Sequence, residues 1–216
     1  MLQVYQGKGS KMTDILFNEE THTYTVGGID RPSVTQIIAP LVDFSFVNPE
    51  LLAYKRDVGV AVHKAIELDI RGELDHASLA PPVSDFFAQW TRWKNLSEWA
   101  PTEAEVRLYS RLGYCGTADI IAIDGFGGTA IIDIKCTTSL PPTVGIQTAA
   151  YAQAYFEETK IRPRRFSLRL QPDGFWFEEH SDTNDFPVFL ALLKVKQWAE
   201  KHGKEIKSYI TNEVKQ

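Results

Sequence analysis

Three carboxylates and one lysine recur in the middle of the chain, within a segment that alternates apolar and polar residues as β-strands do. They are Glu105, Asp119, Asp133 and Lys135. Carboxylate oxygens are the ligands that hard divalent cations prefer, and a lysine beside them can offset negative charge that develops during a reaction. This combination is typical of metal-assisted phosphodiester hydrolysis.

Two glycine-containing turns position these side chains, one centred on position 112 and the other on position 126. Residues equally distant from the centre of a hairpin lie opposite each other and project to the same face. Glu105 is therefore expected opposite Asp119, and Asp119 opposite Asp133. Lys135 shares their face because it lies two residues beyond Asp133. Opposed like charges destabilise a sheet, so we expect cations among them; the alternative is a solvated face that Lys135 and Arg107 neutralise.

Helices and further strands must surround this meander. We expect an α/β fold in which a central mixed β-sheet with an antiparallel meander is flanked by helices. Residues 1–11 are interpreted as a disordered extension or a cloning remnant, and 12–216 as a single domain. Its helices at 49–71 and 81–99 are expected to form an arch over the site. Further helices are expected at 145–158 and 185–202, and strands at 165–170 and 174–179.

The helix expected at 81–99 carries a stripe of large apolar residues. Such a stripe could form a platform on which nucleic-acid bases stack, but its helical spacing favours burial in the core. Its members are Val83, Phe86, Phe87, Trp90, Trp93 and Leu96.

The composition limits the class of protein. The chain has 216 residues and a net charge of −5, which fits one globular domain and argues against a protein that coats nucleic acid by charge alone. Its two cysteines cannot provide a disulfide framework or a four-cysteine iron–sulfur cluster, so no iron–sulfur cluster is expected. We expect no membrane association and a cytoplasmic location, because we find no bilayer-length apolar run and no signal peptide.

Five sequence elements in order resemble the PD-(D/E)XK nuclease superfamily and, within it, the RecB-like and phage-type exonucleases. The resemblance covers roughly positions 20–180 and implies a restriction-endonuclease-like core. The matching elements are Gly59-Val-Ala-Val-His63, Glu105, Gly116-Thr-Ala-Asp119, Asp133-Ile-Lys135 and Gln147-Thr-Ala-Ala-Tyr151.

The resemblance implies a role for each matched residue. Asp119, Asp133 and the carbonyl of Ile134 would bind a metal, and His63 would complete its shell. Glu105 would bind a second metal or a metal-bound water. The implied cofactor is Mg²⁺ or Mn²⁺, in a site for two metals, with Lys135 acting in catalysis.

The resemblance also implies contacts with DNA. Gln147 and Tyr151 would touch the DNA backbone or support Lys135, and their i,i+4 spacing places them on one helix face. Several basic residues are further candidates for phosphate contact, although those at 162–165 could equally form a solvated loop. These candidates are Lys55, Arg56, Arg107, Arg162, Arg164, Arg165 and Arg169.

The function expected from these features is metal-dependent hydrolysis of linear DNA from an end, in recombination, repair or replication. A phage origin, a prokaryotic or phage-infected cytosol and a single-strand annealing or recombination partner fit this expectation. The alternatives are a structure-specific or restriction-type endonuclease, a catalytically silent DNA-binding protein on the same fold, and a metal hydrolase acting on small phosphates. The oligomeric state is left open between a monomer and a ring.

Overall fold

The computed structural model describes residues 2–4, 14–18, 21–43, 45, 47–204 and 206. Its main element is a five-stranded sheet with the order β5-β6-β7-β8-β9, in which only the β7–β8 pair is parallel. A mixed sheet with an antiparallel meander, flanked by helices, confirms the predicted α/β class. The strands are β5 (Ala100–Ser110), β6 (Tyr114–Ile123), β7 (Thr129–Lys135), β8 (Arg164–Gln171) and β9 (Gly174–Glu179).

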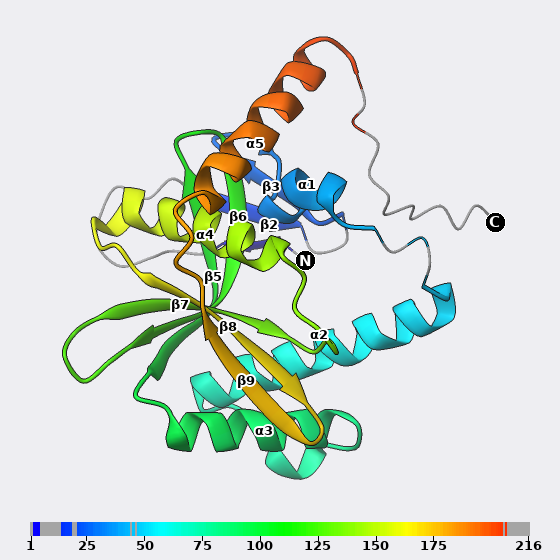
Figure 1. Ribbon diagram of the computed structural model, residues 1–216, viewed down its shortest axis with the longest axis vertical. Coiled ribbons are helices and arrows are strands. Elements are labelled where there is room, and N and C mark those ends of the chain that lie inside the picture. The colour runs from blue at the N-terminus through cyan, green and yellow to red at the C-terminus, as the bar shows by residue number, and fades with distance from the viewer. Residues whose placement is uncertain are drawn as a thin grey trace.

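Helices cover the sheet from two sides (Figure 1). Helix α4 forms the crossover between the parallel strands β7 and β8, a connection that such a pair requires. It packs with α1 and α5, whereas α2 packs with α3 and against the edge strand β5. The helices are α1 (Val34–Ile38), α2 (Pro49–Arg71), α3 (Val83–Leu96), α4 (Thr143–Thr159) and α5 (Asp185–Lys201), with short 3₁₀ turns η1 (Ala39–Leu41) and η2 (His76–Ser78).

Helix α2 has the bounds that its sequence predicts. The Asn48 side chain accepts hydrogen bonds from the backbone N–H groups of Glu50 and Leu51, and Pro49 occupies the first helical position. Gly72 ends the helix in the left-handed conformation, with φ of 71°. These two caps fix the position of a long helix whose middle section faces the candidate site.

Besides a small cluster formed by Ile15, Tyr24, Val26 and Cys115, the buried residues form two large clusters that the five-stranded sheet separates. One lies under α2 and α3 and contains Phe87, Trp90 and Trp93, so the aromatic stripe of the 81–99 segment is a core face, although Leu96 is exposed. The other lies under α1, α4 and α5. Val106, Leu108 and Ala118 pack in this second cluster, whereas Ile120, Ala122, Ala130, Ile132 and Ile134 pack in the first.

A second sheet, with the order β1-β2-β3-β4, is built from the N-terminal residues. Its strands are antiparallel, and Leu2–Val4 pair with β2. The interpretation of residues 1–11 as a disordered extension or a cloning remnant stays a prediction. The rest of that segment lies outside the described residues. The strands are β1 (Leu2–Val4), β2 (Ile15–Asn18), β3 (Thr23–Val26) and β4 (Ile29–Arg31).

Candidate active site

A cavity of about 620 Å³ lies where α2, the N-terminal sheet, α1, the β5–β6 hairpin and α4 meet. Its lining combines Glu105 and Asp119 with basic and hydroxyl side chains from the other walls, whereas Asp133 is buried and is not among the lining residues. The lining residues are His22, Tyr24, Ser33, Val34, Thr35, Arg56, Gly59, Val60, His63, Lys64, Glu67, Glu105, Gly116, Thr117, Asp119, Lys135, Gln147 and Tyr151.

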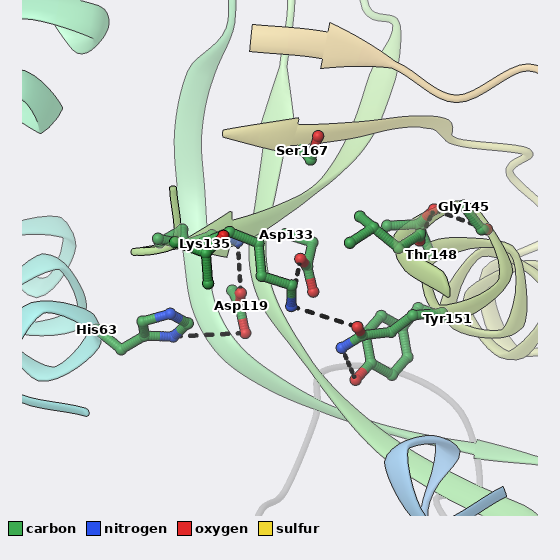
Figure 2. Close-up of polar contacts among 12 residues, drawn as sticks. His63, Asp119, Asp133, Lys135, Gly145, Thr148, Tyr151 and Ser167 are labelled. Atoms are coloured by element: carbon green, nitrogen blue, oxygen red, sulfur yellow. Dashed lines mark hydrogen bonds and ion pairs between the residues drawn. The ribbon is translucent and has the colours of Figure 1, made fainter. Parts of the chain in front are cut away.

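Three side chains in this cavity form a group that could hold a metal ion. His63 comes from α2, Glu105 from β5 and Asp119 from β6, and one ligand atom of each lies within 4.8 Å of the others. The Nδ1 atom of His63 is 3.7 Å from Oδ1 of Asp119 (Figure 2). Imidazole nitrogen and carboxylate oxygen are ligands that divalent cations accept.

Asp119 is fixed by the neighbouring strand. Its Oδ2 atom accepts a hydrogen bond of 2.6 Å from the backbone N–H of Ile134, which leaves Oδ1 directed toward His63 (Figure 2). One carboxylate oxygen therefore secures the β6–β7 junction while the other faces the group of possible ligands. The structure thus brings the backbone N–H of Ile134 to the site, whereas the role of its carbonyl as a metal ligand is implied by the resemblance alone.

Asp133 and Lys135 form a buried ion pair beside this group. Lys135 Nζ lies 2.7 Å from Oδ2 of Asp133, whose side chain is only 1% exposed. Oδ1 of Asp133 has no hydrogen-bond partner among the residues that the structure describes. Burial and the charge of Asp119 raise the pKa of Asp133 to about 6, against the opposing effect of Lys135. Burial lowers the pKa of Lys135, but Asp133 and Asp119 outweigh it and raise the pKa overall.

Two residues of α4 position the lysine. Gln147 Oε1 accepts a hydrogen bond of 3.3 Å from Lys135 Nζ, and Gln147 Nε2 donates to the Tyr151 hydroxyl at 3.0 Å. Tyr151 in turn lies against Gly116, where an added Cβ would come within 2.5 Å of its ring. The resemblance implies either DNA contact or support of Lys135 for Gln147 and Tyr151. The hydrogen bonds from Lys135 to Gln147 and from Gln147 to Tyr151 are those that support of Lys135 requires.

Glu105 has two unfavourable features. Its backbone φ is 52°, a conformation that residues other than glycine rarely adopt. Burial, followed by the charges of Asp119 and Glu67, raises the pKa of its carboxyl to about 8. Glu67 itself is paired on both oxygens, with Lys64 at 2.8 Å and Arg71 at 2.7 Å. The strained backbone and the burial of the carboxylate both cost free energy. A bound cation would offset this cost by stabilising the ionised carboxylate.

The predicted register of the hairpins agrees with the observed pairs. Ala104 pairs with Ile120 and Val106 with Ala118, which sets Glu105 and Asp119 at opposing positions. The β6–β7 ladder begins at Ile120 and Ile132, and one step further along the same register brings Asp119 to Asp133. Strand alternation predicts a single apolar face behind the acids, to which Val106, Ala118 and Ile120 would belong. The structure instead divides these residues between the two cores. The positive φ of Glu105 interrupts the regular alternation of β5 at the point of division.

The structure separates the candidate DNA-binding arginines. Arg56 lines the cavity, and Arg107, Arg164 and Arg165 are not among its lining residues. Arg165 is 13% exposed and binds Asp185 at 2.8 Å, and Arg164 forms two hydrogen bonds with Glu179. These pairs hold β8 to its surroundings, which sequence alone could not distinguish from phosphate contact.

One wall of the cavity was not predicted from the sequence. It comes from the N-terminal sheet, the start of α1 and β6, and its members are His22, Tyr24, Ser33, Thr35 and Thr117. The hydroxyl of Tyr24 lies 2.7 Å from Oγ1 of Thr117, which joins the two sheets. No motif links these distant positions, so only tertiary structure shows that they meet.

Of the two helices expected to arch over the site, only α2 lines the cavity. Its residues Arg56, Gly59, Val60, His63 and Lys64 face the cavity, together with the buried Glu67. No residue of α3 is among the lining residues, because α3 packs on β8 and β9. The arch of both helices over the site stays a prediction, and α2 is the helix of the two that contributes lining residues.

Comparisons with known proteins add little to this geometry. No protein-family description matches the chain, and no curated protein matches it. Among solved structures, it is similar to a candidate exonuclease from Eubacterium rectale, with 13% sequence identity, 69% coverage of each chain and a TM-score of 0.44. No helix in the described part of the chain is long and apolar enough to cross a bilayer.

Proposed function

We propose that this chain is a divalent-metal-dependent nuclease of the PD-(D/E)XK type that hydrolyses phosphodiester bonds in DNA. The observation that supports it best is a single arrangement. The possible ligands His63, Glu105 and Asp119 converge in one cavity, beside the buried pair of Asp133 and Lys135. The order of the motifs along the chain supports the same assignment, with residues 12–216 as one nuclease domain.

The donor set fits a hard divalent cation such as Mg²⁺ or Mn²⁺. Glu105, Asp119 and Asp133 supply carboxylate oxygens, and His63 supplies a nitrogen. Two features of the protein call for positive charge there: the raised pKa of the Glu105 carboxyl and the buried Oδ1 of Asp133 without a described partner. Bound at these residues, the cation would act as a Lewis acid on the phosphate and lower the pKa of a water molecule.

The chain's own groups have distinct tasks in this proposal. Asp119 is oriented by the Ile134 N–H, so its free oxygen is held in place before any ligand arrives. Lys135 is held between Asp133 and Gln147, and its ammonium faces the cavity in which a phosphate would lie. A fixed ammonium stabilises negative charge on the phosphate oxygens most strongly as that charge grows toward the transition state.

The direct test is digestion of end-labelled linear, nicked and circular DNA by the purified protein with Mg²⁺, with Mn²⁺ and with a chelator. We expect cleavage only with metal. Cleavage of linear DNA alone identifies an exonuclease, as the motif order suggests, and cleavage of circles identifies an endonuclease. Absence of cleavage under all metal conditions contradicts the proposal, and metal-free binding of DNA would then favour a catalytically silent DNA-binding protein.

The biological setting remains part of the proposal and has its own test. Processing of DNA ends in recombination, repair or replication would require a free end and a partner that uses the exposed strand. A coupled assay with a single-strand annealing protein measures this directly. Stimulation of annealing by the wild-type chain, and not by an Asp133→Ala variant, is the expected result.

A further inference from the structure

Helix α2 has a glycine in the middle of its cavity face. Gly59 follows Arg56 by three residues and precedes His63 by four, a spacing that places all three on one side of the helix. All three line the cavity. His63 belongs to the candidate metal centre, so Gly59 lies about 6 Å further along the helix axis from it. The wall of the cavity therefore has a gap next to the metal centre.

Within the described residues, no backbone or packing requirement accounts for a glycine at this position. Glycine is the least favourable residue in a helix interior apart from proline. Gly59 does not have a positive φ, so its backbone conformation is open to any residue. A Cβ added there would meet no atom within 4 Å, so no described part of the chain packs closely against it. The space beside Gly59 is the cavity, and a ligand is what remains to approach it.

The charges on either side of the gap indicate the kind of ligand. Arg56 has a side chain that is 65% exposed and forms a long, exposed ion pair of 3.7 Å with Asp57, which a phosphate can replace. At the other end of the gap lies the His63 group, where the proposed cation would add positive charge. The guanidinium of Arg56, the side-chain-free surface at Gly59 and the candidate metal centre follow one another along the helix. A polyanionic strand could contact all three at once.

We propose that the strand being cut runs along α2, with the sugar-phosphate backbone next to the scissile phosphate against Gly59 and a further phosphate at Arg56. This inference rests on the proposed nuclease function and adds a binding subsite to it. Gly59 admits the strand by having no side chain, and Arg56 holds it by charge. A side chain at position 59 would separate the strand from the helix and weaken binding without disturbing the metal ligands.

The test uses the variants Gly59→Ala and Gly59→Leu. The control variant, Ala61→Leu, introduces the same leucine side chain on the same helix. Ala61 is exposed on the same helix and is not among the lining residues of the cavity. Gly59→Ala should raise the melting temperature by about 2–4 °C, because helix propensity improves. Gly59→Leu should raise both KM for a labelled oligonucleotide in Mg²⁺ and its dissociation constant in Ca²⁺ by about tenfold or more, with kcat nearly unchanged. Ala61→Leu should change neither constant.

A small diester separates this subsite from the metal centre. Bis(p-nitrophenyl) phosphate carries a single phosphate and no strand beyond it, so Gly59→Leu should slow its hydrolysis far less than it slows cleavage of the oligonucleotide. Equal loss on the diester and on DNA would show damage to the metal centre and overturn the inference. So would an unchanged KM and dissociation constant for the oligonucleotide.

Arg56→Ala provides an independent readout. Loss of one phosphate contact should reduce the slope of log affinity against log salt by about one, whatever the sequence of the oligonucleotide. An unchanged slope would contradict the role of Arg56. If the wild-type protein cuts neither DNA nor the diester, the proposed nuclease function fails. The Ca²⁺ binding series then decides this inference alone.

Discussion

Asp119 and Ile134 are joined across two strands by a hydrogen bond of 2.6 Å, from the Ile134 backbone N–H to Oδ2 of the carboxylate. The bond directs the other oxygen toward His63, 3.7 Å away. The position of this acid is therefore set by the backbone of the sheet and not by packing of its own side chain.

Asp119→Ala and Asp133→Ala should each abolish hydrolysis while the protein stays folded. Asp119→Ala removes a donor from the group of His63, Glu105 and Asp119, and Asp133→Ala removes the ion-pair partner of Lys135 together with a proposed metal-binding carboxylate. A loss of about a thousandfold corresponds to about 4 kcal/mol in transition-state stabilisation. Single-turnover cleavage at saturating metal measures the rate, and circular dichroism checks the fold. Near wild-type cleavage by either variant would remove that residue from the site.

His63→Ala should weaken activity most at low metal concentration. His63 contributes one ligand among several, so excess Mn²⁺ should restore part of the rate. The measurement is a titration of activity with Mg²⁺ and with Mn²⁺, alongside direct Mn²⁺ binding. A metal titration identical to that of the wild-type protein would return His63 to a structural role.

Lys135→Ala should lower kcat by about a hundredfold or more, as loss of a transition-state donor does, while DNA affinity in Ca²⁺ changes little. Gln147→Leu should lower kcat less, because Lys135 keeps its ion pair with Asp133 and loses only the contact to Gln147. Lys135→Arg tests the opposing view that only the charge matters. Full activity in Lys135→Arg, or weak binding with an unaltered single-turnover rate in Lys135→Ala, would exclude a catalytic role.

Arg165→Ala should destabilise the fold and not act through DNA. The substitution leaves the largely buried carboxylate of Asp185 without its partner, which costs about 2–4 kcal/mol. Arg164→Ala is the matched control, since its pair with Glu179 is about half exposed and contributes below about 1 kcal/mol. Urea unfolding measures both. If Arg165→Ala is as stable as wild type and binds DNA less tightly, the phosphate role predicted from the sequence is restored.

Gly116→Ala should destabilise the protein by about 1–3 kcal/mol, because the added methyl group would overlap the ring of Tyr151. Movement of Tyr151 would also disturb Gln147, so kcat should fall with stability. Gly125→Ala is the control, since a Cβ there meets no atom within 4 Å. Thermal melting and cleavage assays on both variants check the prediction, which an unaltered melting temperature for Gly116→Ala would contradict.

Features that depend on residues close together in the sequence could be predicted from it. The bounds of α2 were predictable because its caps, Asn48 and Gly72, are local. The opposition of Glu105 and Asp119 was predictable because a short turn sets the register of a hairpin. The roles of these residues stay predictions until the variants are measured.

Features that depend on long-range packing could not be predicted in this way. Nothing local to Arg165 distinguishes an ion pair with Asp185 from a contact with phosphate. The positive φ of Glu105 likewise has no local sequence signal, and with it the division of the apolar residues between two cores was missed. The contact between Tyr24 and Thr117 joins positions 93 residues apart, which is why the N-terminal wall was not expected.

That same wall sets a condition on when the cavity can exist during synthesis of the chain. His22 and Tyr24 are made early, whereas Gln147 and Tyr151 on the opposite side are made more than a hundred residues later. A growing chain that has not yet released α4 from the ribosome lacks both the α4 wall of the cavity and the support of Lys135 by Gln147. Whatever chemistry the cavity performs therefore has to wait until the chain has been made and folded through α4.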